Sequence, residues 1–329
     1  MKAAQLHAYG EPLSLDQVPE PLLGPSDVLV QVHASSVNPI DVKVRAGGQR
    51  GALRYKLPWI QGMDLSGVVL SVGEQVTTFK PGDAVYGSPS ATRPGCWAER
   101  AVVDHSQLAL KPRNLDHVQA ATLPLVGLTA WQCLLPALTE RPNPLVFIQA
   151  GAGGVGSFAI QLAAHHGAFV STTASPAKHA LLQGLGAQRC IDYRTQRYDE
   201  LLPPQDIVLD ALGGPEQARA FTVLKRGGHL ASIVTWLPQN TARYGPILGL
   251  GASAAGVVSF HARGLLKGIN TAQVIKKPLG HQLAEITALV EQGAIKPVID
   301  AVYPLEDINQ AMDHVASGRS TGKVAVQLR

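Results

Sequence analysis

A glycine-rich turn between an apolar strand and a helix is the feature that most constrains the fold of this sequence. Residues 145–150 read Leu-Val-Phe-Ile-Gln-Ala, and Gly151, Gly153 and Gly156 follow with the spacing G-x-G-x-x-G. Glycines at this spacing let a pyrophosphate approach the backbone N–H groups at the positive end of the helix dipole. Residues 157–164 then form an apolar helical stripe, which supplies the strand–turn–helix context that the motif requires. We therefore predict a dinucleotide site here, against the alternative of a tight turn alone.

Strands and helices alternate after this turn but not before it. The further strands expected are residues 169–173, 189–193, 206–210 and 228–234. Their alternation with helices predicts a parallel, doubly wound α/β sheet. Residues before about 120 instead form short strands divided by Gly and Pro turns, which is typical of a compact, barrel-like β domain. We predict that 1–122 and 275–329 form this β-rich domain and that 123–274 is an inserted nucleotide-binding domain.

The composition argues against several classes of partner. The formal net charge is +4 and the Lys and Arg residues are scattered, so we expect neither nucleic acid nor membrane as a partner, whereas an anionic small ligand fits. The longest lightly polar run, residues 247–260, is too short to span a bilayer. Cys96, Cys133 and Cys190 are too widely spaced for a disulfide framework or a metal knuckle, so we expect a cytoplasmic protein without a metal site.

The segment after the second strand of the expected sheet predicts which nucleotide binds. About 20 residues after the glycine turn, NAD-specific sheets carry an acid that binds the ribose 2′-hydroxyl. This chain has no acid there, but it has Ser175 and Lys178, with Tyr193 at the end of the next strand. Hydroxyls and an ammonium can bind a 2′-phosphate that an acid would repel, so the sequence favours NADPH over NADH. The alternative is that Lys178 is a solvated helix residue.

A short helix predicted in the β-rich region begins at Asn38. Asn38 fits an N-cap, Pro39 the first helical residue, Asp41 an acid in the first turn, and Gly47 the stop. This structural interpretation explains Asn38 and Asp41 without any chemistry. A functional role for Asn38 therefore stays open beside it.

These motifs and several others resemble those of the medium-chain dehydrogenase/reductase superfamily, in its zinc-free, quinone oxidoreductase or zeta-crystallin-like branch. The matching stretches are 37–41, 45–47, 62–69, 81–87, 123–124, 128–130, 150–156 and 321–324. The resemblance implies a GroES-like β-rich catalytic domain with an inserted Rossmann domain. Zinc-dependent members have Cys where Asn38 stands and Gly-His-Glu where Gly62-Met63-Asp64 stands, and Asn and Met are poor zinc ligands. The resemblance therefore implies a chain without zinc.

The same resemblance assigns roles to individual residues. Asn38 would face the nicotinamide ribose or the substrate carbonyl, and Thr129 the nicotinamide. The remaining cofactor contacts would be Ala152, Gly153, Gly154 and Val155 at the pyrophosphate, Ser175, Lys178 and Tyr193 at the 2′-phosphate, and Phe260 and His261 in a strand passing the carboxamide. Lys43 stands where the branch often has tyrosine, and it is either an electrophilic donor to the substrate or an exposed helix lysine.

The expected function is NADPH-dependent reduction of a quinone or an α,β-unsaturated carbonyl by hydride transfer without a metal. Such acceptors delocalise the negative charge that develops, and positioned donors stabilise it on oxygen. One alternative is reduction of an enoyl thioester, for which Arg50 and Arg54 could bind the carrier phosphate. Another is a non-catalytic NADPH-binding role. The resemblance also implies a homodimer paired through the strand expected near Val257–His261.

Overall fold

The chain folds into two compact units. The structure is a computed structural model that describes residues 1–50, 55–93 and 95–329. Unit 1 comprises Met1–Leu128 and Lys277–Arg329, and unit 2 comprises Thr129–Lys276. The first division falls six residues after the expected position at 122, inside the helix α3 (Pro124–Thr139). The second falls two residues after the expected position at 275.

Unit 1 is built around a seven-stranded sheet whose order is β15–β16–β3–β5–β6–β8, with β7 also paired to β3. Its strands are β3 (Asp27–Val37), β5 (Leu65–Val72), β6 (Ala84–Gly87), β7 (Arg100–Asp104), β8 (Leu108–Leu110), β15 (Ile299–Pro304) and β16 (Lys323–Gln327). A smaller sheet has the order β2 (Ser14–Gln17), β1 (Lys2–Leu6), β4 (Trp59–Ile60). The helices are α1 (Pro39–Arg45), α2 (His117–Ala121), α9 (Gly280–Glu291) and α10 (Ile308–Ala316).

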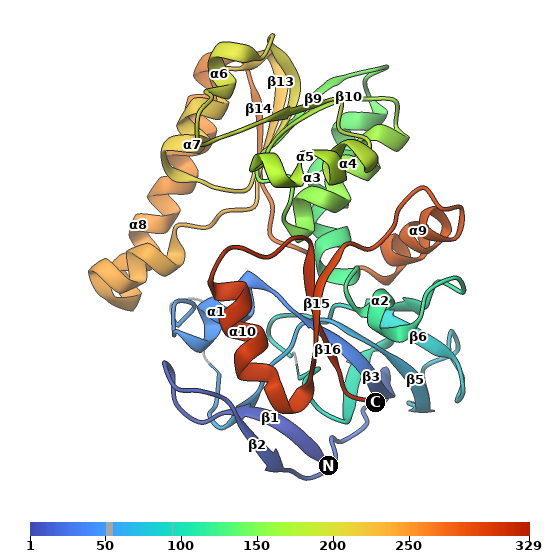
Figure 1. Ribbon diagram of the computed structural model, residues 1–329. Helices are drawn as coiled ribbons and strands as arrows, with labels where there is room; N and C mark the ends of the chain where they lie inside the picture. The colour runs from blue at the N-terminus through green and yellow to red at the C-terminus, as the bar shows by residue number, and fades with distance from the viewer. Residues whose placement is uncertain (51–54, 94) are drawn as a thin grey trace. The chain divides into compact units, whose positions relative to one another are not determined.

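The carboxyl-terminal strand β16 completes the sheet of unit 1. It pairs antiparallel with β3, and Val324 lies opposite Val37. Alternate residues of β3, Val28, Val30 and Val32, are buried in one core because successive side chains of a strand point to opposite faces. Figure 1 shows β16 in red beside β3 in blue, although the two strands are nearly 290 residues apart in the sequence.

Unit 2 contains a six-stranded parallel sheet with the order β11–β10–β9–β12–β13–β14. The strands are β9 (Leu145–Ile148), β10 (Phe169–Thr173), β11 (Arg189–Ile191), β12 (Gln205–Asp210), β13 (Leu224–Ser232) and β14 (Asn270–Gln273). The helices are α4 (Gly154–His165), α5 (His179–Gly184), α6 (Tyr198–Leu201), α7 (Gly214–Ala220) and α8 (Leu237–Lys267). In chain order this is 3-2-1-4-5-6, the doubly wound dinucleotide-binding arrangement. The predicted fold class, a GroES-like β-rich domain with an inserted Rossmann sheet, is confirmed.

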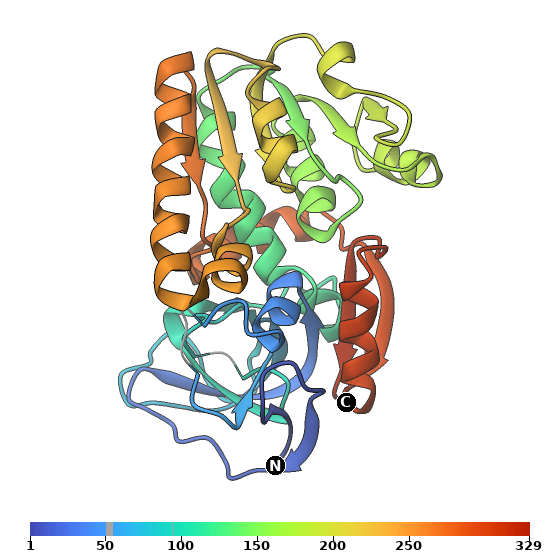
Figure 2. The same cartoon turned by 90° about the vertical axis from the view of Figure 1, so that its left-hand side faces the viewer.

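One element differs from the sequence prediction. Residues Val257–His261 lie inside α8, so the strand expected there is wrong, and the edge strand of the sheet is β14. The buried residues of α8 include Gly249, Ser253, Phe260 and Gly264, and this spacing follows the helical period of 3.6 rather than the strand period of 2. Figure 2 shows α8 in orange beside β14 in unit 2. By length and composition alone, α8 is also long and apolar enough to cross a membrane.

Candidate functional site

The glycine turn joins β9 to α4, and its three motif glycines meet different surroundings. A Cβ on Gly151 would lie 2.1 Å from Thr172 Oγ1, and one on Gly156 would lie 2.4 Å from the Ala150 carbonyl oxygen. A Cβ on Gly153 would come no closer than 3.4 Å to the neighbouring protein atoms. Gly151 and Gly156 are therefore required by packing, whereas Gly153 leaves space beside the backbone.

The amino end of α4 fits an anionic group. The helix begins at Gly154 with Gly153 as its N-cap residue, so its first N–H groups have no acceptor within the helix. Of the residues assigned to the pyrophosphate, Ala152 and Gly153 precede the helix, and Gly154 and Val155 are its first two residues. Partial positive charge at a helix amino terminus favours phosphate. These four residues thus form one candidate pyrophosphate site.

The residues assigned to a 2′-phosphate also lie at the carboxyl edge of this sheet. Thr173 of β10 pairs in register with Ile191 of β11, and Ser175 and Tyr193 each follow two residues later. Lys178 ends the short 3₁₀ helix Pro176–Lys178 that begins after Ser175. Because β9 and β10 are parallel neighbours, the loop after β10 and the glycine turn lie at the same edge. Unit 2 therefore brings together both groups of residues predicted to bind phosphate.

A second set of polar residues is buried in unit 1 around Asn38. The Asn38 Nδ2 group donates to Asp64 Oδ2 at 2.8 Å, and the Lys323 ammonium donates to Asn38 Oδ1 and to the Val37 carbonyl oxygen. Lys323 Nζ lies 3.6 Å from Asp64 Oδ2. The cluster fixes the orientation of the Asn38 carboxamide, because its oxygen accepts from an ammonium and its nitrogen donates to a carboxylate.

Asp64 is held by three further hydrogen bonds. Its Oδ2 accepts from Ser36 Oγ at 2.6 Å, its Oδ1 accepts from the Leu125 N–H at 2.8 Å, and its carbonyl oxygen accepts from Ser35 Oγ. Asp64 is completely buried, and a buried carboxylate needs this number of donors. The position that holds Asn38 is therefore rigid.

Asp41 adds a second acid to the cluster. Its Oδ2 accepts the Asn38 backbone N–H at 2.8 Å, so Asp41 caps the amino end of α1, as the predicted acid of the first turn. Asn38 occupies the predicted N-cap position, and its carboxamide also bonds to Asp64 and Lys323. The pKa of Asp41 is raised to about 7, mainly by burial and also by the nearby Asp64 carboxylate, and the Asn38 N–H and the Lys323 ammonium partly oppose this increase. Burial also lowers the pKa of Lys323.

Three other predicted site residues, Lys43, Thr129 and Phe260, lie on three different helices. Lys43 is an exposed residue of α1, and partial desolvation lowers the pKa of its ammonium; the structure shows it outside the hydrogen bonds of the Asn38 cluster. Thr129 is a buried residue of α3. Phe260 is buried in the core of unit 2 with Phe147 and Phe221, so the prediction that it passes the nicotinamide in a strand is wrong.

The prediction that His261 lies in a strand is wrong for the same reason, because this residue is also part of α8. It is an exposed residue of α8, and its Nδ1 lies 2.8 Å from Thr271 Oγ1 of β14. The side chains of α8 that face the sheet are thus used for packing, and those that face away reach solvent. Of the two arginines considered for a carrier phosphate, the guanidinium of Arg50 lies 4.0 Å from the centre of the Tyr9 ring. Arg54 lies outside the described residues.

Sequence reasoning missed Asp64, Lys323 and Tyr55. Asp64 and Lys323 fall within stretches that carried the resemblance, and a lysine at the start of the apolar run Lys323-Val324-Ala325-Val326 was a signal of a buried charge. Tyr55 stacks on Trp59, with ring centroids 3.6 Å apart, and donates its hydroxyl hydrogen to the Ala91 carbonyl oxygen. Burial raises the pKa of Tyr55, and the nearby Asp41 carboxylate adds to the increase. A tertiary contact of this kind leaves no local pattern.

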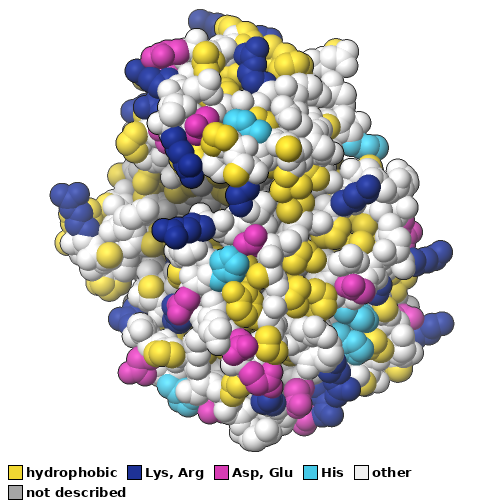
Figure 3. Space-filling model, in the orientation of Figure 1, with side chains coloured by type: hydrophobic (Ala, Val, Ile, Leu, Met, Phe, Trp, Pro, Cys, Tyr) yellow, Lys and Arg dark blue, Asp and Glu magenta, His cyan; other side chains and the backbone are white. Residues whose placement is uncertain are grey.

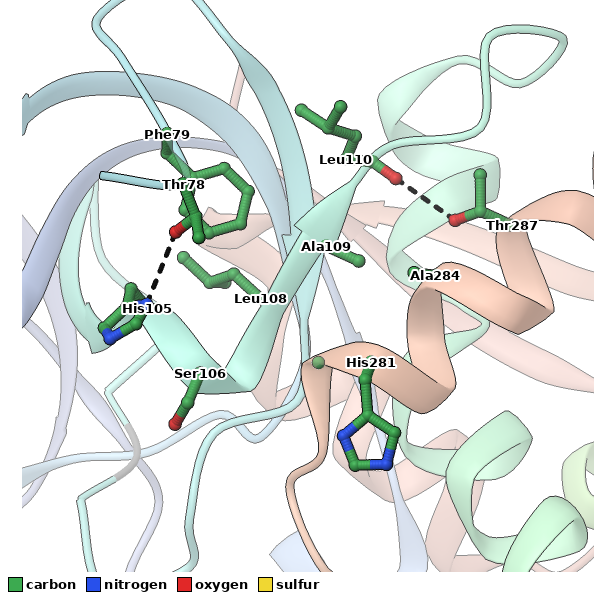
Figure 4. A pocket seen from close by; sticks show the side chains of 11 residues that line it. Thr78, Phe79, His105, Ser106, Leu108, Ala109, Leu110, His281, Ala284 and Thr287 are labelled. Atoms are coloured by element: carbon green, nitrogen blue, oxygen red, sulfur yellow. Dashed lines mark hydrogen bonds between the residues drawn. The ribbon is translucent and has the colours of Figure 1, made fainter. Parts of the chain in front are cut away.

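Unit 1 also has a hollow of about 550 Å³ between β8 and α9. Figure 4 shows Phe79 and Leu108 on one side of it and Ala284 and Thr287 on the other, with the Thr287 hydroxyl bonded to the Leu110 carbonyl oxygen. None of the predicted site residues lines this hollow.

Comparison with known proteins gives the family. The model described as alcohol dehydrogenase GroES-like domain matches residues 24–113, and the one described as zinc-binding dehydrogenase matches residues 185–326. The human protein named NAD(P)H oxidoreductase RTN4IP1, mitochondrial, is 34% identical over 92% of this chain and 82% of its own length. The NADPH-dependent alkenal/one oxidoreductase, chloroplastic, of Arabidopsis thaliana is 33% identical over 99% of this chain and 79% of its own length.

A solved structure agrees with these relatives. The quinone oxidoreductase from Coxiella burnetii is similar to this chain with a TM-score of 0.87 and 32% identity, over 100% of this chain and 99% of that one. The relatives and the solved structure each cover at least two thirds of both chains at more than 30% identity. The chain therefore belongs to the medium-chain dehydrogenase/reductase superfamily, in its branch of NAD(P)H and quinone oxidoreductases, and is an oxidoreductase.

Proposed function

We propose that this protein reduces a quinone or an α,β-unsaturated carbonyl with NADPH and without a metal ion. Bound NADPH would supply the hydride. Gly153, Gly154 and Val155 would bind its pyrophosphate through backbone N–H groups, and Ala152 would lie in the same turn. Ser175, Lys178 and Tyr193 would bind its 2′-phosphate. Asn38 would donate a hydrogen bond to the acceptor oxygen as negative charge develops there.

The observation that carries this proposal is the fixed carboxamide of Asn38. One Nδ2 hydrogen goes to Asp64, and among the described residues no acceptor is recorded for the other. A buried donor with an unused hydrogen is ready for a ligand oxygen. The neighbouring Lys323 ammonium increases the polarity of this donor, because it bonds to the oxygen of the same amide.

The donor set around Asn38 supports a mechanism without zinc. An amide oxygen, a peptide oxygen and a carboxylate surround the Lys323 ammonium, so a lysine supplies the positive charge of this cluster. Among the described residues, no group of three or more His, Cys, Asp or Glu side chains is placed so that it could hold a metal ion. Metal analysis of the purified protein, with activity measured before and after chelation, tests this part. Stoichiometric zinc whose removal abolishes turnover would refute it.

An acceptor screen tests the reaction. The purified protein should oxidise NADPH in the presence of quinones, of enones, or of both, and Asn38→Ala should lower kcat by roughly tenfold to a thousandfold, as removal of an oxyanion donor does. Lys43→Ala in parallel decides whether Lys43 contacts the substrate. Turnover of enoyl thioesters in preference to free enones would replace this function by the alternative one. NADPH binding without turnover of any acceptor would refute the enzymatic proposal.

The preference for NADPH depends on Lys178. One charge-assisted hydrogen bond is worth about 1.5–3 kcal/mol, so Lys178→Ala should raise the KM for NADPH roughly tenfold to a hundredfold. The KM for NADH should stay the same, because NADH has no 2′-phosphate. Lys80→Ala, which removes an exposed lysine of unit 1, is the matched control. Equal kcat/KM for NADPH and NADH in the unmodified protein would contradict the proposal.

We also propose that the protein is a cytoplasmic homodimer. Cys96, Cys133 and Cys190 form no disulfide with one another, as expected in a reducing compartment. In unit 2, β14 is the outer strand of the sheet, and an edge strand can pair with its equivalent in a second copy. Light scattering at micromolar concentration measures the mass directly, and a monomer would contradict the dimer.

A further inference from the structure

The side of α8 that faces away from the sheet of unit 2 is unusually apolar. Seven of the nineteen exposed large hydrophobic residues of the described chain lie on this helix. They are Tyr244, Ile247, Leu248, Leu250, Val258, Leu265 and Leu266. Ile247 is 80% exposed, Leu265 83% and Leu266 87%. Six of them follow the kink at Gly245 and lie on one continuous helical segment, and exposed apolar side chains gathered in this way usually mark a site of interaction.

The opposite side of α8 is fixed to unit 2. Phe260 is in the core with Phe147 and Phe221, and a Cβ on Gly264 would lie 2.5 Å from Thr271 Cγ2 of β14. This close packing holds the part of α8 that follows its kink at Gly245 against the sheet. The helix meets the length and composition criteria for crossing a membrane, but leaving the sheet would expose the core around Phe260. A position on the surface of a bilayer is compatible with the fold, and a position across it is not.

The charged residues of α8 and of the sequence on either side of it are all positive. Residues 217–284 contain no Asp or Glu. Arg243, Arg263 and Lys267 lie on α8 itself, and the Arg226 side chain packs against Gly268 at its carboxyl end. Among the residues that the structure describes, none of these four makes an ion pair. Figure 3 shows hydrophobic and basic side chains together at the left edge, where α8 lies in Figure 1.

An anionic bilayer matches this surface better than a second copy of the helix does. Two α8 helices packed face to face would bring basic residues of both copies together, with no acid on either helix to balance them. A bilayer containing anionic lipid offers phosphates for the arginines and lysine and acyl chains for the leucines. We propose that α8 is a membrane-surface anchor, through which the protein binds reversibly to anionic lipid bilayers.

The proposal goes beyond the catalytic function and does not depend on it. It also departs from the expectation of no membrane partner, which was drawn from the scattered charges of the whole chain. The relevant charges are sparse along the sequence, but Arg263 and Lys267 lie on the same helical segment as the exposed leucines, and Arg243 lies just before the kink at Gly245.

Sedimentation with lipid vesicles tests the anchor. The full-length protein should pellet with vesicles of phosphatidylcholine and phosphatidylglycerol, and at least tenfold more weakly with vesicles of phosphatidylcholine alone. Replacing both leucines, Leu265→Ser with Leu266→Ser, should weaken binding to the anionic vesicles at least tenfold. Leu22→Ser is the matched control, because Leu22 is 91% exposed in unit 1 and should not affect binding. The triple change Arg243→Gln, Arg263→Gln, Lys267→Gln should weaken binding and its dependence on salt.

Two results would overturn the proposal. One is failure of the unmodified protein to pellet with anionic vesicles. The other is that the leucine changes leave vesicle binding intact but convert a dimer to a monomer in light scattering, since α8 would then be an interface between copies. NADPH affinity and the thermal midpoint of each variant show that it is folded. Because these measurements need no turnover, failure of the anchor is distinguishable from failure of the proposed enzymatic function.

Discussion

Lys323 balances the charge of the buried cluster around Asn38. The Asp64 carboxylate and the Lys323 ammonium are buried together, and removing the ammonium leaves Asp64 without its cation. Lys323→Met should therefore lower the free energy of unfolding by about 3–5 kcal/mol, as loss of one partner of a buried ion pair does. Urea denaturation measures this difference.

A double change separates charge from packing. If the loss comes from the unpaired acid, Lys323→Met combined with Asp64→Asn should recover part of the lost stability. The kcat of the folded double variant should stay low, because the Asn38 oxygen no longer accepts from an ammonium. Full activity in the double variant would show that Lys323 has only a structural role.

Asp41 makes stability depend on pH in an unusual direction. Its pKa is about 7 in the folded protein against 3.8 for an ordinary aspartate, so between these values the folded state holds a proton that the unfolded state has lost. This contribution is fully present below the unfolded pKa and is lost as the pH rises toward 7, by up to ~1.4 kcal/mol per pH unit. Asp41→Asn should remove that slope. Urea unfolding from about pH 5 to about pH 8 checks it, and parallel curves for both proteins would contradict the assignment.

At the scale of an element, different glycines of the turn between β9 and α4 are expected to affect stability and cofactor binding. Gly156→Ala should lower the free energy of unfolding by about 1–3 kcal/mol, because its Cβ would meet the Ala150 carbonyl oxygen at 2.4 Å. Gly153→Ala should leave stability nearly unchanged and weaken NADPH binding, because its methyl group would take the space of the pyrophosphate. Calorimetry and NADPH titration measure the two effects.

Gly184 provides the control for these two changes. It lies in α5, and a Cβ there would meet nothing within 4 Å. Gly184→Ala should stabilise the protein by roughly 0.5–1 kcal/mol through the higher helix propensity of alanine and leave NADPH binding unchanged. Loss of stability at Gly153 equal to that at Gly156 would show that both glycines serve packing alone.

Periodic and local signals account for the elements that were predicted correctly. The strand at residues 169–173 and the glycine turn were predictable because apolar runs and glycine spacing are local features. The segment Val257–His261 contains β-branched and aromatic residues that favour a strand. In the structure its burial follows a helical period, because one side of α8 packs against the sheet, and this packing is not visible in the local sequence. The sixth strand, β14, is short and only partly buried, so it has little apolar pattern.

The candidate site was predictable to the extent that its residues fall in local motifs. Asn38 was predicted to begin a helix and the glycine turn to precede one, and both positions are as predicted, whereas the binding roles of these residues stay predictions. Lys323 was not, since its role comes from the pairing of β16 with β3 across most of the chain. A buried ion cluster is a tertiary property, and a single sequence records its members without their contacts.

At the scale of the whole molecule, the chain begins and ends in the same unit. Unit 2 is one continuous segment, whereas unit 1 needs both the first 128 residues and the last 53, Lys277–Arg329. The sheet of unit 1 is therefore joined by contacts of very large sequence separation, which form slowly. Unit 2 is one continuous segment, so its sheet forms through contacts of shorter sequence separation.

The pairing of β16 with β3 has a consequence for synthesis on the ribosome. Lys323 follows all of unit 2 in the sequence, so a nascent chain can hold a finished nucleotide-binding sheet while Asn38 still lacks its cation. Assembly of the cluster around Asn38 thus awaits translation of β16, and a chain that lacked this strand would carry the nucleotide-binding fold without the Lys323 ammonium beside Asn38.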